Sequence, residues 1–137
     1  MLKRFMNPGP TDMWSSIGLL VLRLAAGGMM IYGHGWKKLM ALLDGKGGKF
    51  PDPLGVGNEL SMALAVGAEV GAAALVMLGI FTRLAAVPLM FTMIVAAFII
   101  HGSDPFAKKE MALLYLAAYT TLACTGAGRY SVDGAVR

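Results

Sequence analysis

Apolar residues dominate four long stretches of the chain, and polar residues gather between these stretches. The four stretches run at about 13–34, 60–81, 84–101 and 110–125. A helix that crosses a membrane needs roughly 20 mostly apolar residues. Inside a bilayer the backbone groups must bond to one another, so such segments fold as helices. The pattern predicts an all-α, integral membrane four-helix bundle, in which the fourth helix is the shortest and most polar.

The segments between the apolar stretches differ in length and composition. Residues 41–58 form a polar loop rich in Gly, Pro and charge, whereas only Thr82 and Arg83 separate the second stretch from the third. Four crossings place both termini on the same side of a single transmembrane domain, residues 1–137. Basic residues divide almost evenly between the two sides, so the positive-inside rule does not orient the chain.

Composition supports a membrane protein and limits its chemistry. The chain is 57% hydrophobic and 15% charged, with a mean hydropathy of +0.66. Soluble domains are about 45–50% apolar and about 25% charged, so a disordered chain is excluded and a soluble monomer is strongly disfavoured. The net charge of +4 comes without a basic stripe, so no nucleic acid partner is expected. The single cysteine, Cys124, excludes a dithiol redox couple within this chain.

Arg23 and Glu69 are the charged residues that fall in the middle of apolar stretches. A charge at the bilayer centre costs roughly 2.5–3.5 kcal/mol even on a lenient scale, so such residues usually face inward and pair. Arg23 lies 11 residues before His34, and Glu69 lies 10 residues after Glu59. These separations correspond to roughly 16 Å and 15 Å from the same membrane face. We therefore predict an Arg23–Glu69 ion pair, which either only fixes helix register or also contacts a ligand or a proton path.

Two short patterns accompany this pair. Gly67 and Gly71 form a G-x-x-x-G motif around Glu69, which predicts that another helix packs closely there. The tetrapeptide Arg-Leu-Ala-Ala occurs at Arg23 and again at Arg83, which is compatible with either a duplicated helical hairpin or chance in an Ala- and Leu-rich chain.

A polar cluster is predicted where three helices end. His34 and His101 end the first and third stretches, Glu110 begins the fourth, and Lys38 lies at the rim. We interpret these residues as a candidate ligand or proton site. A quinone headgroup needs an apolar slot, donors to its carbonyls and a group that exchanges protons, and histidine titrates near neutral pH.

Other interpretations of the same residues stay open. The histidines and a carboxylate could hold a transition metal or a haem, but no local ligand spacing such as H-x-x-x-H is present, so we predict no metal site. The residues could also cap helix ends without any ligand. The 11 methionines suggest copper transport, although methionine in a membrane helix usually serves as flexible packing.

Several segments, taken in order, resemble the DoxX family. The resemblance runs from about residue 17 to residue 133. Its segments are Arg23-Leu-Ala-Ala-Gly with His34-Gly35-Trp36-Lys37-Lys38-Leu39, Glu69-Val-Gly, Leu78-Gly79-Ile80-Phe81-Thr82-Arg83-Leu84-Ala85-Ala86, His101, Glu110 with Leu113-Leu114-Tyr115-Leu116, and Gly126-Ala-Gly-Arg129-Tyr130-Ser131-Val132-Asp133.

The resemblance implies a multi-pass protein of the bacterial inner membrane with cytoplasmic termini. Some DoxX relatives are the small quinone-linked subunit of a thiosulfate:quinone oxidoreductase, and others are linked to complexes that handle thiol oxidants. By this resemblance we expect a small quinone-interacting subunit of a membrane oxidoreductase complex, not catalytic alone, with other subunits or further copies as partners. Function does not follow from fold. A structural or assembly subunit and a small transporter that uses Glu69 are therefore the alternatives.

Overall fold

The computed structural model describes residues 1–136, and these residues form helices joined by loops, with no strand among them. The α-helices are α1 Leu2–Phe5, α2 Met13–Met30, α3 Trp36–Leu43, α4 Asn58–Val66, α5 Ala73–Leu78, α6 Thr82–Val95, α7 Phe106–Thr125 and α8 Val132–Ala135. Three π-helical turns, η1 Ile31–Gly35, η3 Gly67–Ala72 and η4 Ala96–Ile100, and one 3-10 turn, η2 Gly47–Lys49, complete the elements.

The π turns join α-helices into longer continuous helices. Met13–Leu43 has 31 residues, Asn58–Leu78 has 21 and Thr82–Ile100 has 19. Within residues 1–136, these three are the helices long and apolar enough to cross a membrane. The fourth, α7, has 20 residues but is less apolar, because it contains Lys108, Lys109 and Glu110. The prediction of an all-α membrane protein is thus confirmed, with the fourth helix the least clear crossing.

The helix ends differ from the predicted ones, most of all in the first helix. The sequence predicts an end at residue 34, but η1 carries the helix on through α3 to Leu43. The glycines and lysines after residue 32 resemble a helix end, but a π turn keeps the backbone bonded through them. The long loop therefore covers 44–57, and α7 begins at Phe106 rather than at residue 110.

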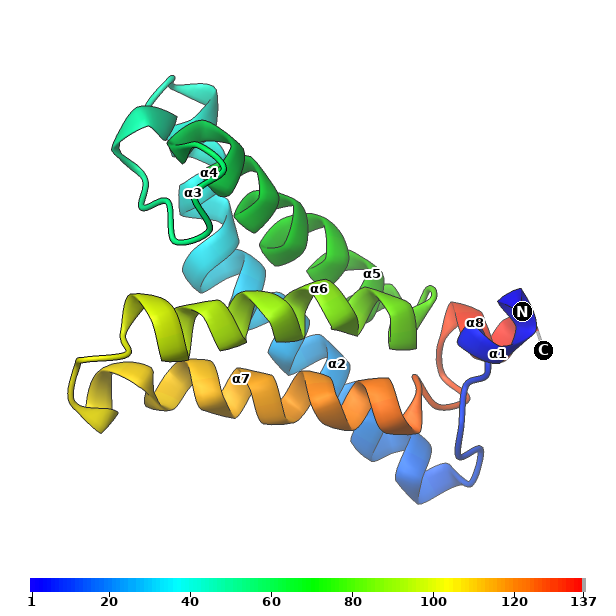
Figure 1. Ribbon diagram of the computed structural model, residues 1–137. Coiled ribbons are helices and arrows are strands. Elements are labelled where there is room, and N and C mark those ends of the chain that lie inside the picture. Colours follow the sequence, from blue (N-terminus) through cyan, green and yellow to red (C-terminus); the bar gives the residue numbers. More distant parts are fainter. Residues whose placement is uncertain (137) are drawn as a thin grey trace.

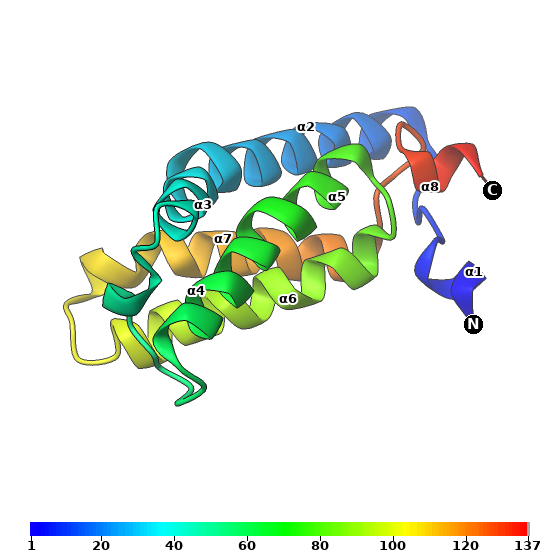
Figure 2. The ribbon, with the colours of Figure 1, turned by 90° about the horizontal axis from the view of Figure 1, so that it is seen from above.

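The helices form a bundle with two distinct ends. Helices α6 and α7 lie side by side, while α2–α3 and α4–α5 pack across them (Figures 1 and 2). The helices nearest the two termini, α1 and α8, lie where α5 turns into α6, which we call the terminal end. The loop 44–57 and the α6–α7 turn lie at the opposite end, the loop end. The prediction that both termini share one side is confirmed.

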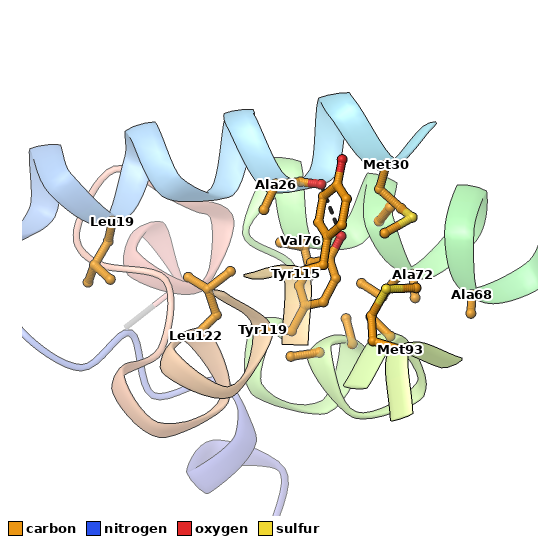
Figure 3. Packing of buried hydrophobic residues seen from close by; sticks show 14 residues of the cluster. Leu19, Ala26, Met30, Ala68, Ala72, Val76, Met93, Tyr115, Tyr119 and Leu122 are labelled. Carbon is orange, nitrogen blue, oxygen red and sulfur yellow. Dashed lines mark hydrogen bonds between the residues drawn. The ribbon is translucent and has the colours of Figure 1, made fainter. Parts of the chain in front are cut away.

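A small apolar core joins the helices. Met30, Val76, Leu89, Tyr119 and Leu122 are fully buried in it. The hydroxyl of Tyr119 on α7 donates to the carbonyl oxygen of Ala26 on α2 at 3.0 Å (Figure 3). Large apolar side chains such as those of Leu64, Phe91 and Phe98 are exposed on the outside. An outer surface this apolar is suited to contact with lipid.

Close helix packing depends on glycines other than the predicted pair. A Cβ atom on Gly35 would lie 2.7 Å from the carbonyl oxygen of Glu69, and one on Gly27 would lie 2.9 Å from that of Ala73. By contrast, Gly67 and Gly71 are exposed, and a Cβ atom on either would meet nothing within 4 Å among the described residues. Another helix does approach closely at Glu69, but Gly35 provides this approach, and the prediction that Gly67 and Gly71 provide it within this chain is wrong.

Candidate functional site

Arg23 is buried near the terminal end, where it binds backbone carbonyls rather than a carboxylate. The residue is 1% exposed. Its Nη1 donates to the carbonyl oxygen of Met77 at 2.8 Å, and its Nη2 donates to that of Tyr130 at 2.5 Å. The last carbonyls of a helix lack partners within that helix and carry partial negative charge. Arg23 thus caps the end of α5 and ties the C-terminal segment to it.

The C-terminal segment is attached to the same turn by a second charged residue. Asp133, at 1% exposure, accepts hydrogen bonds from the backbone N–H groups of Phe81 at 2.9 Å and Thr82 at 3.0 Å. These N–H groups begin α6, so Asp133 acts as its N-terminal cap from about 50 residues further along the chain. Asp133 also lies within Coulombic range of Arg23.

The predicted Arg23–Glu69 pair is wrong, because Glu69 pairs with Lys38. The Lys38 Nζ atom lies 2.7 Å from Glu69 Oε1. The depth comparison failed because it placed the loop end of the first helix at His34. The helix continues to Leu43, so Arg23 lies 20 residues (43 minus 23) from that end. Its side chain also leans toward the N-terminus of its own helix, away from Glu69.

A mostly apolar groove lies beside this ion pair. It has a volume of about 220 Å³, and α4–η3, α6–η4 and the loop residues Phe50, Pro53 and Leu54 line it. Leu64, Phe91 and Ile100 line the groove and are also 42–54% exposed on the outer surface. The groove therefore adjoins the surface that faces lipid.

The ion pair gives the groove its charged groups. The Glu69 side chain is 3% exposed and the Lys38 side chain 30%. The second carboxylate oxygen, Glu69 Oε2, is buried and has no hydrogen-bond partner among the described residues. The Lys38 ammonium also lies 5.8 Å from the centre of the Phe50 ring, within cation–π range. A buried acceptor without a partner is uncommon in folded proteins.

Asp52 fixes the loop that covers the groove. Its carboxylate accepts from the Ser61 hydroxyl at 2.7 Å and from the backbone N–H groups of Gly57 at 2.8 Å and Val56 at 3.0 Å. These hydrogen bonds, the one from Ser61 first, lower the pKa of Asp52 below its ordinary value. The loop that carries Phe50 and Pro53 is thereby held against the start of α4.

The other predicted site residues lie away from the groove. The His34 ring meets the Tyr115 ring edge-on, with centroids 5.8 Å apart. His101 Nδ1 lies 2.8 Å from an oxygen of Asp104, and this hydrogen bond is the main reason that the pKa of Asp104 is lowered.

These predicted residues make no direct contact with one another in the part of the chain that the structure describes. Among the described residues, no hydrogen bond, ion pair or ring contact links His34, His101 and Glu110 to one another, and none of them lines the groove. No group of three or more His, Cys, Asp or Glu residues suited to a metal ion occurs in residues 1–136. A ligand role for these three side chains stays a prediction. Of the four candidates, Lys38 is the one that the groove contains.

Little in the sequence indicates that the groove residues lie together. Lys38 and Glu69 are 31 residues apart, and Lys38 lies beyond the predicted end of its helix. The usable signal was Gly35, three residues before Lys38, whose missing side chain lets α3 approach η3. Phe50 and Pro53 lie in a loop whose course no periodicity predicts.

The fold and the groove define an all-helical, multi-pass membrane protein with a groove next to lipid and an ion pair whose carboxylate is buried. The DoxX family model matches residues 18–102, and the chain belongs to the DoxX family. The matched segment contains Arg23, Lys38 and Glu69. Similarity of the last helix and C-terminal segment to the family lies outside this match and stays a prediction. A search of curated proteins and a search of solved structures each found no match to this chain.

Proposed function

We propose that this chain is a quinone-interacting subunit of a membrane oxidoreductase and that the groove binds the quinone headgroup. The observation that carries the proposal is an apolar groove next to lipid that contains a charged donor, the half-buried ammonium of Lys38. A quinone is an apolar ring with a lipid tail and two carbonyl oxygens that accept hydrogen bonds, so it needs an apolar groove open to lipid and a donor within it.

The size of the groove suits a single ring. An apolar cavity of about 150 Å³ is enough to bind benzene, and this groove has about 220 Å³. A substituted quinone ring would lie between the walls made by α4–η3 and α6–η4. Its tail would leave across Leu64 and Phe91, which are exposed on the outer surface.

The charged groups suit the two oxygens and their protons. An ammonium group has three N–H donors, and Lys38 uses one of them on Glu69. The others are free to donate to a ring oxygen. Glu69 Oε2 has no partner among the described residues, so it would accept a hydrogen bond from a ring oxygen that has gained a proton on reduction. This location differs from the one predicted at His34 and His101, which do not line the groove.

The electrons would come from a partner subunit. Cys124 is the single cysteine, so the chain has no thiol pair of its own to oxidise. In line with the family resemblance, we place the protein in the bacterial inner membrane with its termini in the cytoplasm.

Binding of a short-chain quinone tests the proposal. The full chain in lipid nanodiscs should bind decylubiquinone, measured by quenching of tryptophan fluorescence. Lys38→Met should weaken binding by about 10-fold or more, because a hydrogen bond from a charged donor contributes about 1.5–3 kcal/mol. Lys37→Met is the matched control, because the neighbouring Lys37 is exposed and does not line the groove.

A second variant guards against misfolding of Lys38→Met, which leaves Glu69 without its partner. Ala65→Phe fills the groove and leaves the ion pair in place, so it should also abolish binding. Absence of binding by the wild-type protein would contradict the proposal and favour a structural or assembly subunit. Equal losses in Lys37→Met and Lys38→Met would contradict the location of the site.

A further inference from the structure

Glu69 gives the groove an acceptor that nothing in the described chain satisfies. The residue is 2% exposed, Lys38 occupies Oε1, and Oε2 is buried without a partner. Because a buried charged acceptor is costly to leave unpaired, a ligand that brings a donor to Oε2 gains more than one that does not.

The other polar side chains that line the groove are already engaged. The Ser61 hydroxyl donates to Asp52 at 2.7 Å, and the Thr92 hydroxyl donates to the carbonyl oxygen of Pro88 at 2.8 Å. Both hydroxyl hydrogens are thus committed, which leaves the Lys38 ammonium as the donor and the Glu69 carboxylate as the charged acceptor for a ring oxygen.

We infer that the groove selects the reduced hydroquinone over the quinone and that Glu69 is the specificity-determining residue. This inference rests on the proposed function. A quinone presents two carbonyl acceptors and no donor, so beside Glu69 Oε2 it places one acceptor against another. A hydroquinone has the same ring and tail but carries an O–H group at each oxygen, and one of these can donate to Oε2.

Lys38 does not make this distinction. Its ammonium only donates, and both a carbonyl oxygen and a hydroxyl oxygen accept. It therefore strengthens the binding of either form, whereas the Glu69 carboxylate binds a ring oxygen only when that oxygen carries hydrogen. A site built to bond a hydroxyl discriminates strongly against the analogue that lacks it, because its own buried group is then left unpaired.

Selective binding changes the redox balance of the bound ring. Tighter binding of the reduced form favours net reduction of the bound ring by the electron-donating partner subunit. For a two-electron couple, each tenfold preference raises the midpoint potential of the bound ring by about 30 mV.

The test compares the two redox forms of one probe. Dissociation constants of decylubiquinone and decylubiquinol are measured without oxygen on the full chain in nanodiscs. The wild-type protein should bind the quinol about 10-fold more tightly or better. Glu69→Gln keeps the shape but offers an amide N–H₂ donor to a carbonyl, so the preference should vanish or reverse. Glu59→Gln, an exposed carboxylate at the start of α4, is the matched control and should keep the wild-type preference.

Each outcome bears on the inference. Equal affinity of the wild-type protein for both forms would overturn the selectivity and leave the proposed function standing. Binding of neither form would overturn both. An unchanged preference in Glu69→Gln would remove Glu69 from the role. If Glu69→Gln does not fold, Lys38→Met/Glu69→Gln removes the unpaired ammonium, and retained quinol preference in that double variant would equally overturn the inference.

Discussion

Arg23 and Glu69 are both buried inside the helices, yet their charges are balanced in different ways. Arg23 binds the carbonyls that end α5 and a carbonyl of the C-terminal segment, while Glu69 binds the ammonium of Lys38. The first arrangement uses partial charges on the backbone, and the second uses a full opposite charge. The two residues are therefore expected to stabilise the folded protein independently of each other.

A double-mutant cycle tests this separation. Arg23→Met and Glu69→Gln should have additive effects on the free energy of unfolding, within about 0.5 kcal/mol, because the two residues share no partner. Lys38→Met and Glu69→Gln should instead couple by about 1 kcal/mol or more. Unfolding in detergent micelles, followed by circular dichroism, measures all five variants. Coupling above about 1 kcal/mol between Arg23 and Glu69 would restore the ion pair that the sequence predicted.

The sequence singled out the right residues at this scale but not their partners. Arg23 and Glu69 stand out because the apolar stretches around them contain no other charge. The partners of Arg23 are backbone carbonyls, which every residue has and no pattern marks. The partner of Glu69 lies beyond a helix end that the sequence placed nine residues too early (43 minus 34).

At the scale of elements, the glycines set how closely the first two long helices approach. Gly27 and Gly35 belong to the first helix and face the backbone of the second. The G-x-x-x-G motif lies on the second helix, but its glycines point to the outside. A motif of small residues indicates that close packing is sterically allowed, and it does not say which glycine in a Gly-rich chain provides it.

Alanine substitutions separate the two kinds of glycine. Gly35→Ala should lower the free energy of unfolding by about 1–3 kcal/mol, because its Cβ atom would overlap the backbone at Glu69. Gly67→Ala should leave it unchanged or raise it by up to about 1 kcal/mol, since alanine favours helix and the space is open. Thermal unfolding of both variants is the measurement. A larger loss in Gly67→Ala would mean that this outer face packs against another chain.

The repeated Arg-Leu-Ala-Ala tetrapeptide has a counterpart in the structure. Arg83 donates to the carbonyl oxygens of Cys124 at 2.6 Å and Thr125 at 3.1 Å, which end α7. Arg23 does the same for α5. In each case, an arginine on one helix caps the end of its neighbour at the terminal end. The repeat therefore marks a shared structural role, whatever its origin.

At the scale of the whole molecule, the apolar pattern was enough to predict the bundle and its paired termini. It was not enough to predict how the C-terminal segment attaches to the helices at the terminal end. Residues 129–135 contain one short helix, α8, and no periodic signal, but Asp133 and the carbonyl of Tyr130 join them to α6 and to Arg23. This attachment depends on single polar contacts between segments that are distant in the sequence, and the pattern of apolar and polar residues does not indicate such contacts.

Asp133→Asn tests whether attachment of the C-terminal segment at the terminal end is independent of ligand binding in the groove at the loop end. The variant removes the charge and one of the two oxygens that cap α6, so the free energy of unfolding should fall by about 1–3 kcal/mol. Decylubiquinone should still bind with the wild-type dissociation constant, because the groove and the C-terminal segment share no residue. Asp44→Asn, at an exposed position after α3, is the control for loss of a negative charge. If Asp133→Asn weakened binding as strongly as Lys38→Met, the two ends would be coupled through the helices, and the C-terminal segment would regulate the groove.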